Sequence, residues 1–250
     1  SAKGMRKTAN GTGRHIRLLI RKVLDLFFPR YCPVCDSLLA ETEIGVCPRC
    51  MVRMPRYIEG MQYGLDRLNG DVYIDALYSL FIFKEDGGVR PMIHALKYGG
   101  YSEIGEMLGR MAGRSYPFLP KDYDLIVPVP LHPRKQRKRG YNQALLIAQG
   151  LSRVTGIPVQ EGLRRKVYTD SQTGQSYSER KSAMKGKFAL SPNTRVAGIR
   201  VLLVDDVLTT GATVQAAAEP LAEAFAAKIG VLVAAVTKRP SNWSHYSDER

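Results

Sequence analysis

The chain has 250 residues, 44% of them hydrophobic, which is enough for one α/β domain of about 150 to 200 residues and a small module. With 37 Lys and Arg against 23 Asp and Glu, its formal net charge of +14 favours polyanionic partners such as nucleic acid over a basic surface without a partner. No stretch reaches the roughly 18 consecutive apolar residues of a membrane span. Charges at Arg21, Lys22 and Asp25 interrupt the longest early apolar stretch, unlike a signal-peptide core. We therefore expect a cytoplasmic protein.

Residues 1–29 are expected to form a basic arm followed by an amphipathic helix. The first 14 residues are rich in Gly, Lys, Arg and Thr and should be mobile. From Ile16 to Phe28 the apolar residues follow the spacing of a helix with one apolar face. That face suits packing against the following module better than a membrane surface, because it leads directly into Cys32.

All four cysteines lie in two Cys-x-x-Cys pairs, which eleven residues separate, within a module expected over 30–56. Two such pairs can direct four thiolates at one ion, so we expect a structural zinc site without an open coordination position on Cys32, Cys35, Cys47 and Cys50. Disulfides, a redox pair and an iron–sulfur cluster are the alternatives. Disulfides do not fit a chain without a secretory signal, and a redox motif usually occurs once. Arginines flank the pairs and are available to nucleic acid: Arg30, Arg49, Arg53 and Arg56.

Beyond an expected linker at 57–75, strands alternate with helices, which predicts βαβ units and a parallel sheet over 76–240, with a tail at 241–250. The expected strands are Ala76–Phe83, Leu125–Val129, Arg200–Val204 and Val231–Thr237. The expected helices are Val89–Tyr98, Ile104–Ala112, Asn142–Thr155 and Thr213–Ala226. Pro220 should kink the last helix or begin a new turn within it.

A strongly basic run follows the strand that ends at Val129, at the edge of the sheet where ligands gather in such folds. Five of the six residues from Arg134 to Arg139 are basic, and arginine matches the oxygens of pyrophosphate in pairs. We expect pyrophosphate contacts from Arg137 and Arg139 rather than a merely solvated run. The other cations of the run are available to DNA or RNA: Arg134, Lys135 and Lys138.

The connector from Arg164 to Phe188 is long, polar and basic. Connectors of this length in a compact domain are usually lids or disordered. A lid would exclude water from a reactive sugar centre, so we expect this segment to close over a site.

The most informative segment, VLLVDDVLTTGAT, runs from Val201 to Thr213. Its apolar start predicts a buried parallel strand, and its end predicts the turn into a helix. Gly211 would let the backbone approach a bound group, while free amides and threonine hydroxyls suit a phosphate. Asp205 and Asp206 would repel a phosphate and suit the paired hydroxyls of a ribose. A purely structural turn is the alternative.

This segment resembles the phosphoribosyl diphosphate (PRPP) signature of type I phosphoribosyltransferases. The resemblance implies that Asp205 and Asp206 hold the ribose 2′- and 3′-hydroxyls. It also implies that the 5′-phosphate lies against the following loop, Thr209, Thr210, Gly211, Ala212 and Thr213. Mg²⁺ would be held mainly by diphosphate and ribose oxygens.

Five features in this order resemble the ComF family over about residues 30–238. They are the four-cysteine module, Leu96-Lys97-Tyr98-Gly99-Gly100, the run from Val127 that ends in Arg139-Gly140-Tyr141-Asn142-Gln143-Ala144, Ser171-Gln172-Thr173-Gly174, and the PRPP-like loop. The resemblance implies a type I phosphoribosyltransferase-like parallel sheet flanked by helices, with an N-terminal zinc module. It also implies a bacterial role in DNA uptake, with competence-machinery proteins as partners. Ala183, where the family has asparagine, and Gln175, in place of an apolar residue, depart from the family pattern in the lid.

Two functions follow from these features. One is an enzyme that binds PRPP with Mg²⁺ and lets a nucleophile displace pyrophosphate at C1′, with Lys97 and Tyr141 as candidate bases. The other is a non-catalytic single-stranded DNA-binding protein that retains the fold. Tyrosines available for base stacking in the second case are Tyr31, Tyr98, Tyr141 and Tyr168.

Overall fold

The computed structural model describes residues 29–58, 62–84, 87–166 and 186–237. The expected N-terminal helix, most of the expected lid with Tyr168, and the C-terminal tail lie outside the described residues. Within them, no helix is both long enough and apolar enough to cross a bilayer.

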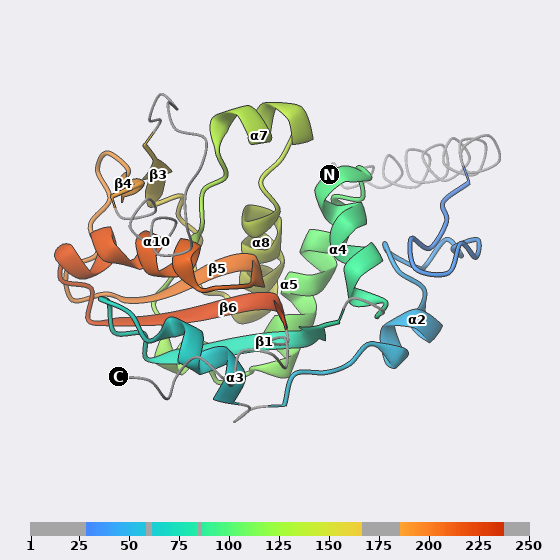
Figure 1. Cartoon of the computed structure of the whole chain (residues 1–250), viewed down its shortest axis with the longest axis horizontal. Helices are drawn as coiled ribbons and strands as arrows, with labels where there is room; N and C mark the ends of the chain where they lie inside the picture. Colours follow the sequence, from blue (N-terminus) through green and yellow to red (C-terminus); the bar gives the residue numbers. More distant parts are fainter. Residues whose placement is uncertain (1–28, 59–61, 85–86, 167–185, 238–250) are drawn as a thin grey trace, which may run out of the picture.

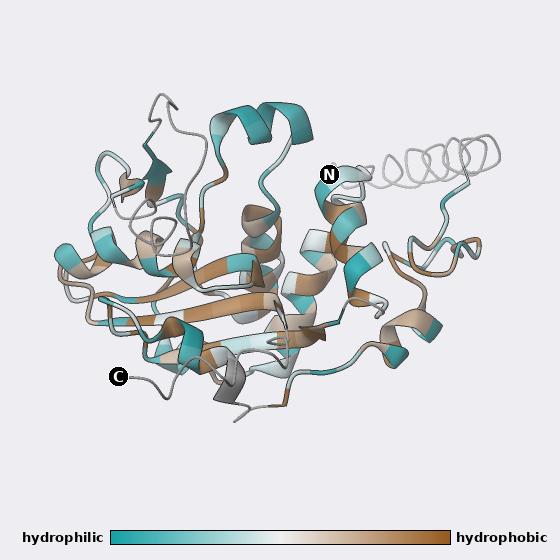
Figure 2. Cartoon of the chain, viewed as in Figure 1, coloured by the Kyte–Doolittle hydropathy of each residue, from teal (hydrophilic) through white to brown (hydrophobic). Residues whose placement is uncertain are grey.

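A four-stranded, fully parallel sheet in the order β1-β6-β5-β2 forms the centre of the fold (Figure 1). Its strands are β1 Ala76–Phe83, β2 Leu125–Pro128, β5 Arg200–Leu208 and β6 Lys228–Thr237. Helices cover both faces, which is why these strands are apolar almost throughout (Figure 2). The expected parallel sheet with flanking helices is confirmed.

The helices lie close to their expected positions, and several short ones join them. The helical segments of the described residues are α2 Pro48–Arg53, α3 Gln62–Leu65, the 3-10 turn η1 Asp66–Leu68, α4 Val89–Tyr98, α5 Glu103–Ser115, α6 Leu119–Asp122, α7 Pro133–Arg139, α8 Gln143–Thr155 and α10 Ala212–Glu223. Two short antiparallel strands, β3 Leu163–Arg165 and β4 Phe188–Leu190, flank the expected lid.

The sheet separates two hydrophobic cores. Leu202 and Val204 of β5 pack with α4, α5 and α8, and the alternating residues Val201 and Leu203 pack with α10. On the first side, α5 and α8 meet through Gly109 and Gly150. A Cβ at either position would come within less than 3.0 Å of the facing helix's backbone. The two helices therefore touch backbone to backbone, which fixes α8 beside the sheet.

Three segments differ from expectation. β5 continues through both aspartates, because Asp205 and Val207 keep pairing with Val233 and Ala235 of β6. α10 continues through Pro220 and ends at Glu223 rather than Ala226. The expected linker at 57–75 contains α3 and η1, and four of its apolar residues are buried in the second core: Tyr57, Leu68, Val72 and Ile74.

The cysteine module packs on the first core. Cys32, Cys47 and Cys50 are buried in the same cluster as residues of α4 and α5. The Tyr101 hydroxyl, just before α5, donates to the Tyr31 carbonyl at 3.2 Å. The module is therefore continuous with the core of the domain.

Candidate functional site

Three elements converge on the side chain of Asp206 at the carboxyl end of β5. Asp206 is only 5% exposed. One carboxylate oxygen, Oδ2, accepts from Gln143 Nε2 of α8 at 2.8 Å and lies 3.0 Å from Lys97 Nζ of α4. The arrangement brings together two residues expected at the site, Lys97 and Asp206. Gln143 joins them at the site, although its place in the motif Arg139–Ala144 indicated no role for it.

Asp205 precedes Asp206 in β5 and is half-buried. Its Oδ1 accepts from the backbone N–H of Asp206 at 2.8 Å. Burial, together with the adjacent Asp206 carboxylate, raises the pKa of Asp205 to about 7, while Lys97 and Arg165 act in the opposite direction. A ligand that donates hydrogen bonds or brings a cation would favour the charged carboxylate here.

The loop after β5 places Thr209 and Thr210 on the surface, and Ala212 and Thr213 begin α10 half-buried. Gly211 is buried with a φ of +80°, and a Cβ there would lie less than 3.0 Å from the Arg67 carbonyl oxygen. The backbone that approaches Gly211 in this structure belongs to Arg67, and the expected contact of Gly211 with a bound group stays a prediction. Gly211 has no side chain to cap α10, and the Thr210 hydroxyl accepts from the Ala212 N–H at 3.4 Å. The later N–H groups of the first turn are the ones that an anion could use.

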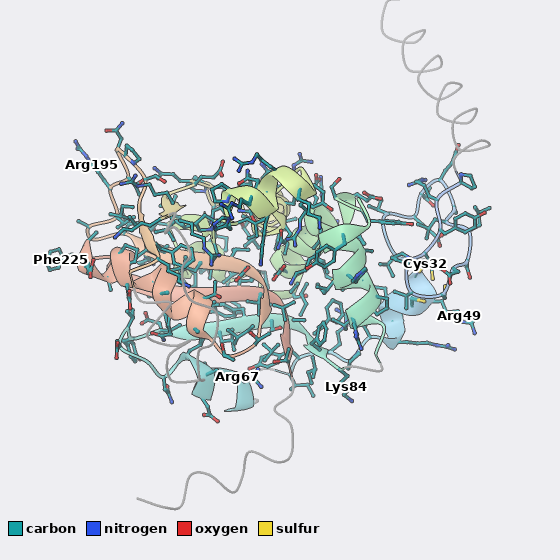
Figure 3. The ribbon with its side chains drawn as sticks, turned by 45° about the horizontal axis from the view of Figure 1, so that its top comes forward. Cys32, Arg49, Arg67, Lys84, Arg195 and Phe225 are labelled. Atoms are coloured by element: carbon teal, nitrogen blue, oxygen red, sulfur yellow. The ribbon has the colours of Figure 1, made fainter. Side chains whose placement is uncertain are left out.

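Arg67 holds this loop from outside, and sequence reasoning missed it. Its Nη1 donates to the Thr209 carbonyl at 2.7 Å and to the Thr237 hydroxyl at 2.7 Å. It lies in η1, below the sheet in the view of Figure 3. Gln215 of α10 in turn holds the chain just after η1, because its Oε1 accepts from the Val72 N–H at 3.2 Å. No local pattern could have indicated Arg67, because 142 residues separate it from Thr209.

The basic run forms α7, which stands beyond the edge of the sheet and is hydrophilic along its length (Figures 1 and 2). His132 Nδ1 caps its start by accepting from the Arg134 N–H at 3.2 Å, and Gly140 ends it with a φ of +85°. The helix lines a hollow of about 370 Å³ with Pro133, Gln136, Arg137 and Gly140. Arg137 thus faces a hollow, and the remaining cations before Arg139 are exposed: Arg134, Lys135 and Lys138.

Arg139 differs from the other cations of α7. Its guanidinium lies 5.1 Å from the centroid of the Tyr98 ring, and its buried Nη1 has no partner among the described residues. Tyr98 is 68% exposed, and its ring centroid also lies 5.0 Å from that of the His94 ring. The Tyr141 hydroxyl, in contrast, donates to the Leu96 carbonyl at 2.6 Å, and burial raises its pKa. Tyr141 therefore anchors α4 to the start of α8, which is a poor arrangement for a base.

The four cysteine sulfurs form one cluster, in which all ligand atoms lie within 4.8 Å of one another (Figure 3). Cys35 Sγ and Cys47 Sγ are 3.7 Å apart, and all four thiols are free. Two sulfurs bound tetrahedrally at about 2.3 Å to one zinc ion would be about 3.8 Å apart, whereas a disulfide measures about 2.05 Å. Burial and the neighbouring sulfurs raise the pKa of Cys50, an effect that a bound cation would oppose. The donor set and its spacing fit a four-thiolate zinc site.

The arginines around the cluster fall into two groups. Arg56 lies 4.9 Å from the centroid of the Phe81 ring, and Arg30 donates to the Glu43 carbonyl at 3.4 Å. Arg49 and Arg53 of α2 are exposed. Arg56 is exposed as well, whereas Arg30 is half-buried.

Comparison with known proteins agrees with this geometry. The family model for the phosphoribosyl transferase domain matches residues 141–248. Competence protein F of Haemophilus influenzae is 42% identical over 92 residues, which cover 36% of this chain and 40% of that protein. The DNA utilization protein YhgH of Escherichia coli is 37% identical over 56% of this chain and 64% of its own length. Competence protein ComFC of Bacillus subtilis is 28% identical over 77% of this chain and 71% of its own. The chain thus spans less than two thirds of the first two relatives.

Proposed function

We propose that this chain, which belongs to the ComF family of phosphoribosyltransferase-like proteins, binds PRPP or a related ribose phosphate and acts in DNA uptake. The observation that carries the proposal is the pair Asp205 and Asp206 near the carboxyl end of β5, close in the chain to the start of α10, where Gly211 supplies no side-chain cap. Carboxylates accept from sugar hydroxyls, and helix N–H groups bind phosphate. The ring hydroxyls of a ribose 5-phosphate would therefore face the carboxylates, and its phosphate would face the start of α10.

In the proposed complex, the two carboxylates orient the ribose, and the backbone of the loop from Thr209 to Thr213 holds the 5′-phosphate. Arg137 and Arg139 supply positive charge for the pyrophosphate group. Mg²⁺, when bound, would neutralise diphosphate oxygens and keep several of its waters. Lys97 leaves Asp206 as the ribose hydroxyls take its place.

The proposed reaction is displacement of pyrophosphate from C1′ by a nucleophilic nitrogen. The C1′–O bond breaks with its electron pair leaving on pyrophosphate, and the C1′–N bond forms. The acceptor's proton then needs a base. Lys97, once released from Asp206 and deprotonated, is a better candidate than Tyr141, because the Tyr141 hydroxyl is held by Leu96.

Isothermal titration with PRPP and Mg²⁺ tests the binding proposal. The wild type should bind, and the double variant Asp205→Asn/Asp206→Asn should lose at least tenfold in affinity, since charged acceptors make the stronger hydrogen bonds. Glu161→Gln, an exposed acid outside the loop, is the matched control. Equal affinities in the double variant and the wild type would remove the ribose assignment. Pyrophosphate release from PRPP with candidate base or amine acceptors then tests turnover.

Single-stranded DNA binding is the second candidate, and the cations of α7 beside the exposed Tyr98 ring favour it. Bases stack on aromatic rings, and a basic helix can follow the phosphate backbone. Binding of an oligonucleotide should weaken linearly on a plot of log affinity against log salt concentration. A salt-independent affinity would remove the electrostatic assignment. Retention of DNA binding by Asp205→Asn/Asp206→Asn would indicate two separate sites.

The remaining assignments belong to the same proposal. The cysteine cluster would hold structural zinc, which metal analysis of the purified protein tests directly. Four free thiols suit a reducing compartment and support a cytoplasmic location. The names of the relatives support partners among competence proteins, which co-purification from competent cells would identify.

A further inference from the structure

Gln143 presents one half of its amide to Asp206 and leaves the other half unpaired. Its Nε2 donates to Asp206 Oδ2 at 2.8 Å. Its Oε1 is buried and has no hydrogen-bond partner in the described part of the chain, and the whole residue is 5% exposed. A carboxylate can only accept, so the NH₂ group must face Asp206 and the oxygen must face away from it.

The backbone around Gln143 holds this amide in place. Asn142, the preceding residue, caps α8 by accepting from the Ala144 N–H at 3.1 Å and donates to the Val129 carbonyl at 3.1 Å. α8 is in turn fixed against α5 by the contact at Gly109 and Gly150. These contacts keep the amide of Gln143 beside Asp206. A buried acceptor without a partner is costly, and a ligand donor at this point would remove that cost.

We propose that Gln143 determines sugar specificity: its Nε2 holds Asp206, and its Oε1 accepts from one ring hydroxyl of a bound ribose phosphate. This role of Gln143 rests on the proposed function and restricts the proposed ligands to sugars that carry that hydroxyl. A ribose satisfies both Asp206 and the amide oxygen, whereas a sugar lacking the relevant hydroxyl leaves the oxygen buried and unpaired. The site would thereby favour ribose phosphates over deoxyribose phosphates.

Titration calorimetry with four probes tests this role: ribose 5-phosphate, 2-deoxyribose 5-phosphate, 3-deoxyribose 5-phosphate and pyrophosphate. Gln143→Met keeps the side-chain length and removes both polar atoms. It should bind ribose 5-phosphate about tenfold more weakly than the wild type, the effect of about one buried hydrogen bond. Because the loss of Nε2 also loosens Asp206, all three sugars should bind more weakly, but the deoxy sugar that lacks the partner of Oε1 should lose less affinity than ribose 5-phosphate. Pyrophosphate affinity should stay within twofold. Gln149→Met, at an exposed glutamine of the same helix, is the matched control and should behave as the wild type.

A second variant keeps the test informative if Gln143→Met folds poorly. Gln143→Glu has nearly the same shape but places a second carboxylate against Asp206, and it should also lose ribose 5-phosphate affinity. Unchanged ribose 5-phosphate affinity in the folded variant, or an equal loss for all three sugars, overturns the role of Gln143. If the wild type itself fails to bind ribose 5-phosphate, the proposed function fails as well. The two failures are therefore distinguishable.

Discussion

Replacing Gly211 with alanine is the most direct test of how the loop after β5 is built. Gly211 has a φ of +80°, which side chains with a Cβ rarely adopt. A Cβ added there would lie less than 3.0 Å from the Arg67 carbonyl oxygen, whereas ordinary contacts begin at 3.4 Å. The substitution therefore combines a conformational cost with a steric cost.

The two costs can be estimated separately. Placing alanine in the left-handed region costs about 1–2 kcal/mol. Overpacking against fixed backbone typically costs about 1–3 kcal/mol more. We expect Gly211→Ala to lower the free energy of unfolding by about 2–5 kcal/mol, which for a domain of this size lowers the melting temperature by roughly 5–15 °C.

Gly156 supplies the control, because it ends α8 with a φ of +74° and has open space around the position of a Cβ. Gly156→Ala should show the conformational cost alone. Urea unfolding followed by circular dichroism, with both variants and the wild type at one pH, measures the difference. Equal losses of stability in the two variants would refute the close approach of Arg67 to Gly211. PRPP titration of the folded Gly211→Ala protein should also show weaker binding, because the loop must move.

Three further predictions address other parts of the site. Arg67→Met should weaken PRPP binding in calorimetry more than Arg67→Lys, because lysine can still donate to one of the Thr209 and Thr237 oxygens; equal effects would contradict the anchoring role. Asp205 has a folded-state pKa of about 7 against about 4 when unfolded, so the native state binds more protons between these values and this group makes stability fall as pH rises from about 4 to 7. Asp205→Asn should remove that part of the pH dependence of the free energy of unfolding, measured by denaturant titrations. An unchanged pH dependence in the variant would contradict the raised pKa of Asp205. A strong chelator at neutral pH should lower the melting temperature measured by scanning calorimetry, because the four cysteines should hold zinc in the folded state; an unchanged melting temperature for protein that metal analysis finds loaded would contradict a structural role of the metal.

The fold was largely predictable because its signals are local. β1 and α4 have the bounds expected from their apolar patterns, and the alternation of strands and helices indicated a parallel sheet. The end of β5 was less predictable, because a strand with two aspartates continues only where a neighbouring strand keeps pairing with it. The short helix α7 was not assigned, since a run of cations shows no apolar periodicity.

The site was predictable where the chain itself brings residues together and not where the fold does. The acidic pair and the threonine loop are nearly contiguous in the chain, so their order alone predicted a site for a sugar phosphate. Arg67 reaches the loop across 142 residues, from a segment whose sequence suggested only a linker. The burial of Gln143 and the ion pair of Lys97 with Asp206 likewise depend on how α4, α8 and β5 meet. The elevated pKa of Asp205 also required its buried surroundings.

The cysteine module and α4 share one hydrophobic core, which links the cysteine cluster to the site around Asp206. Val89 and Met92 of α4 pack in the same hydrophobic cluster as Cys32, Cys47 and Cys50. The opposite end of this helix carries Lys97, the cation paired with Asp206. Oxidation of the thiols would disturb the packing beneath the first turn of α4, and a rigid helix would carry that disturbance to its last turn. A disturbance of the cysteine module should therefore be felt at the ion pair between Lys97 and Asp206.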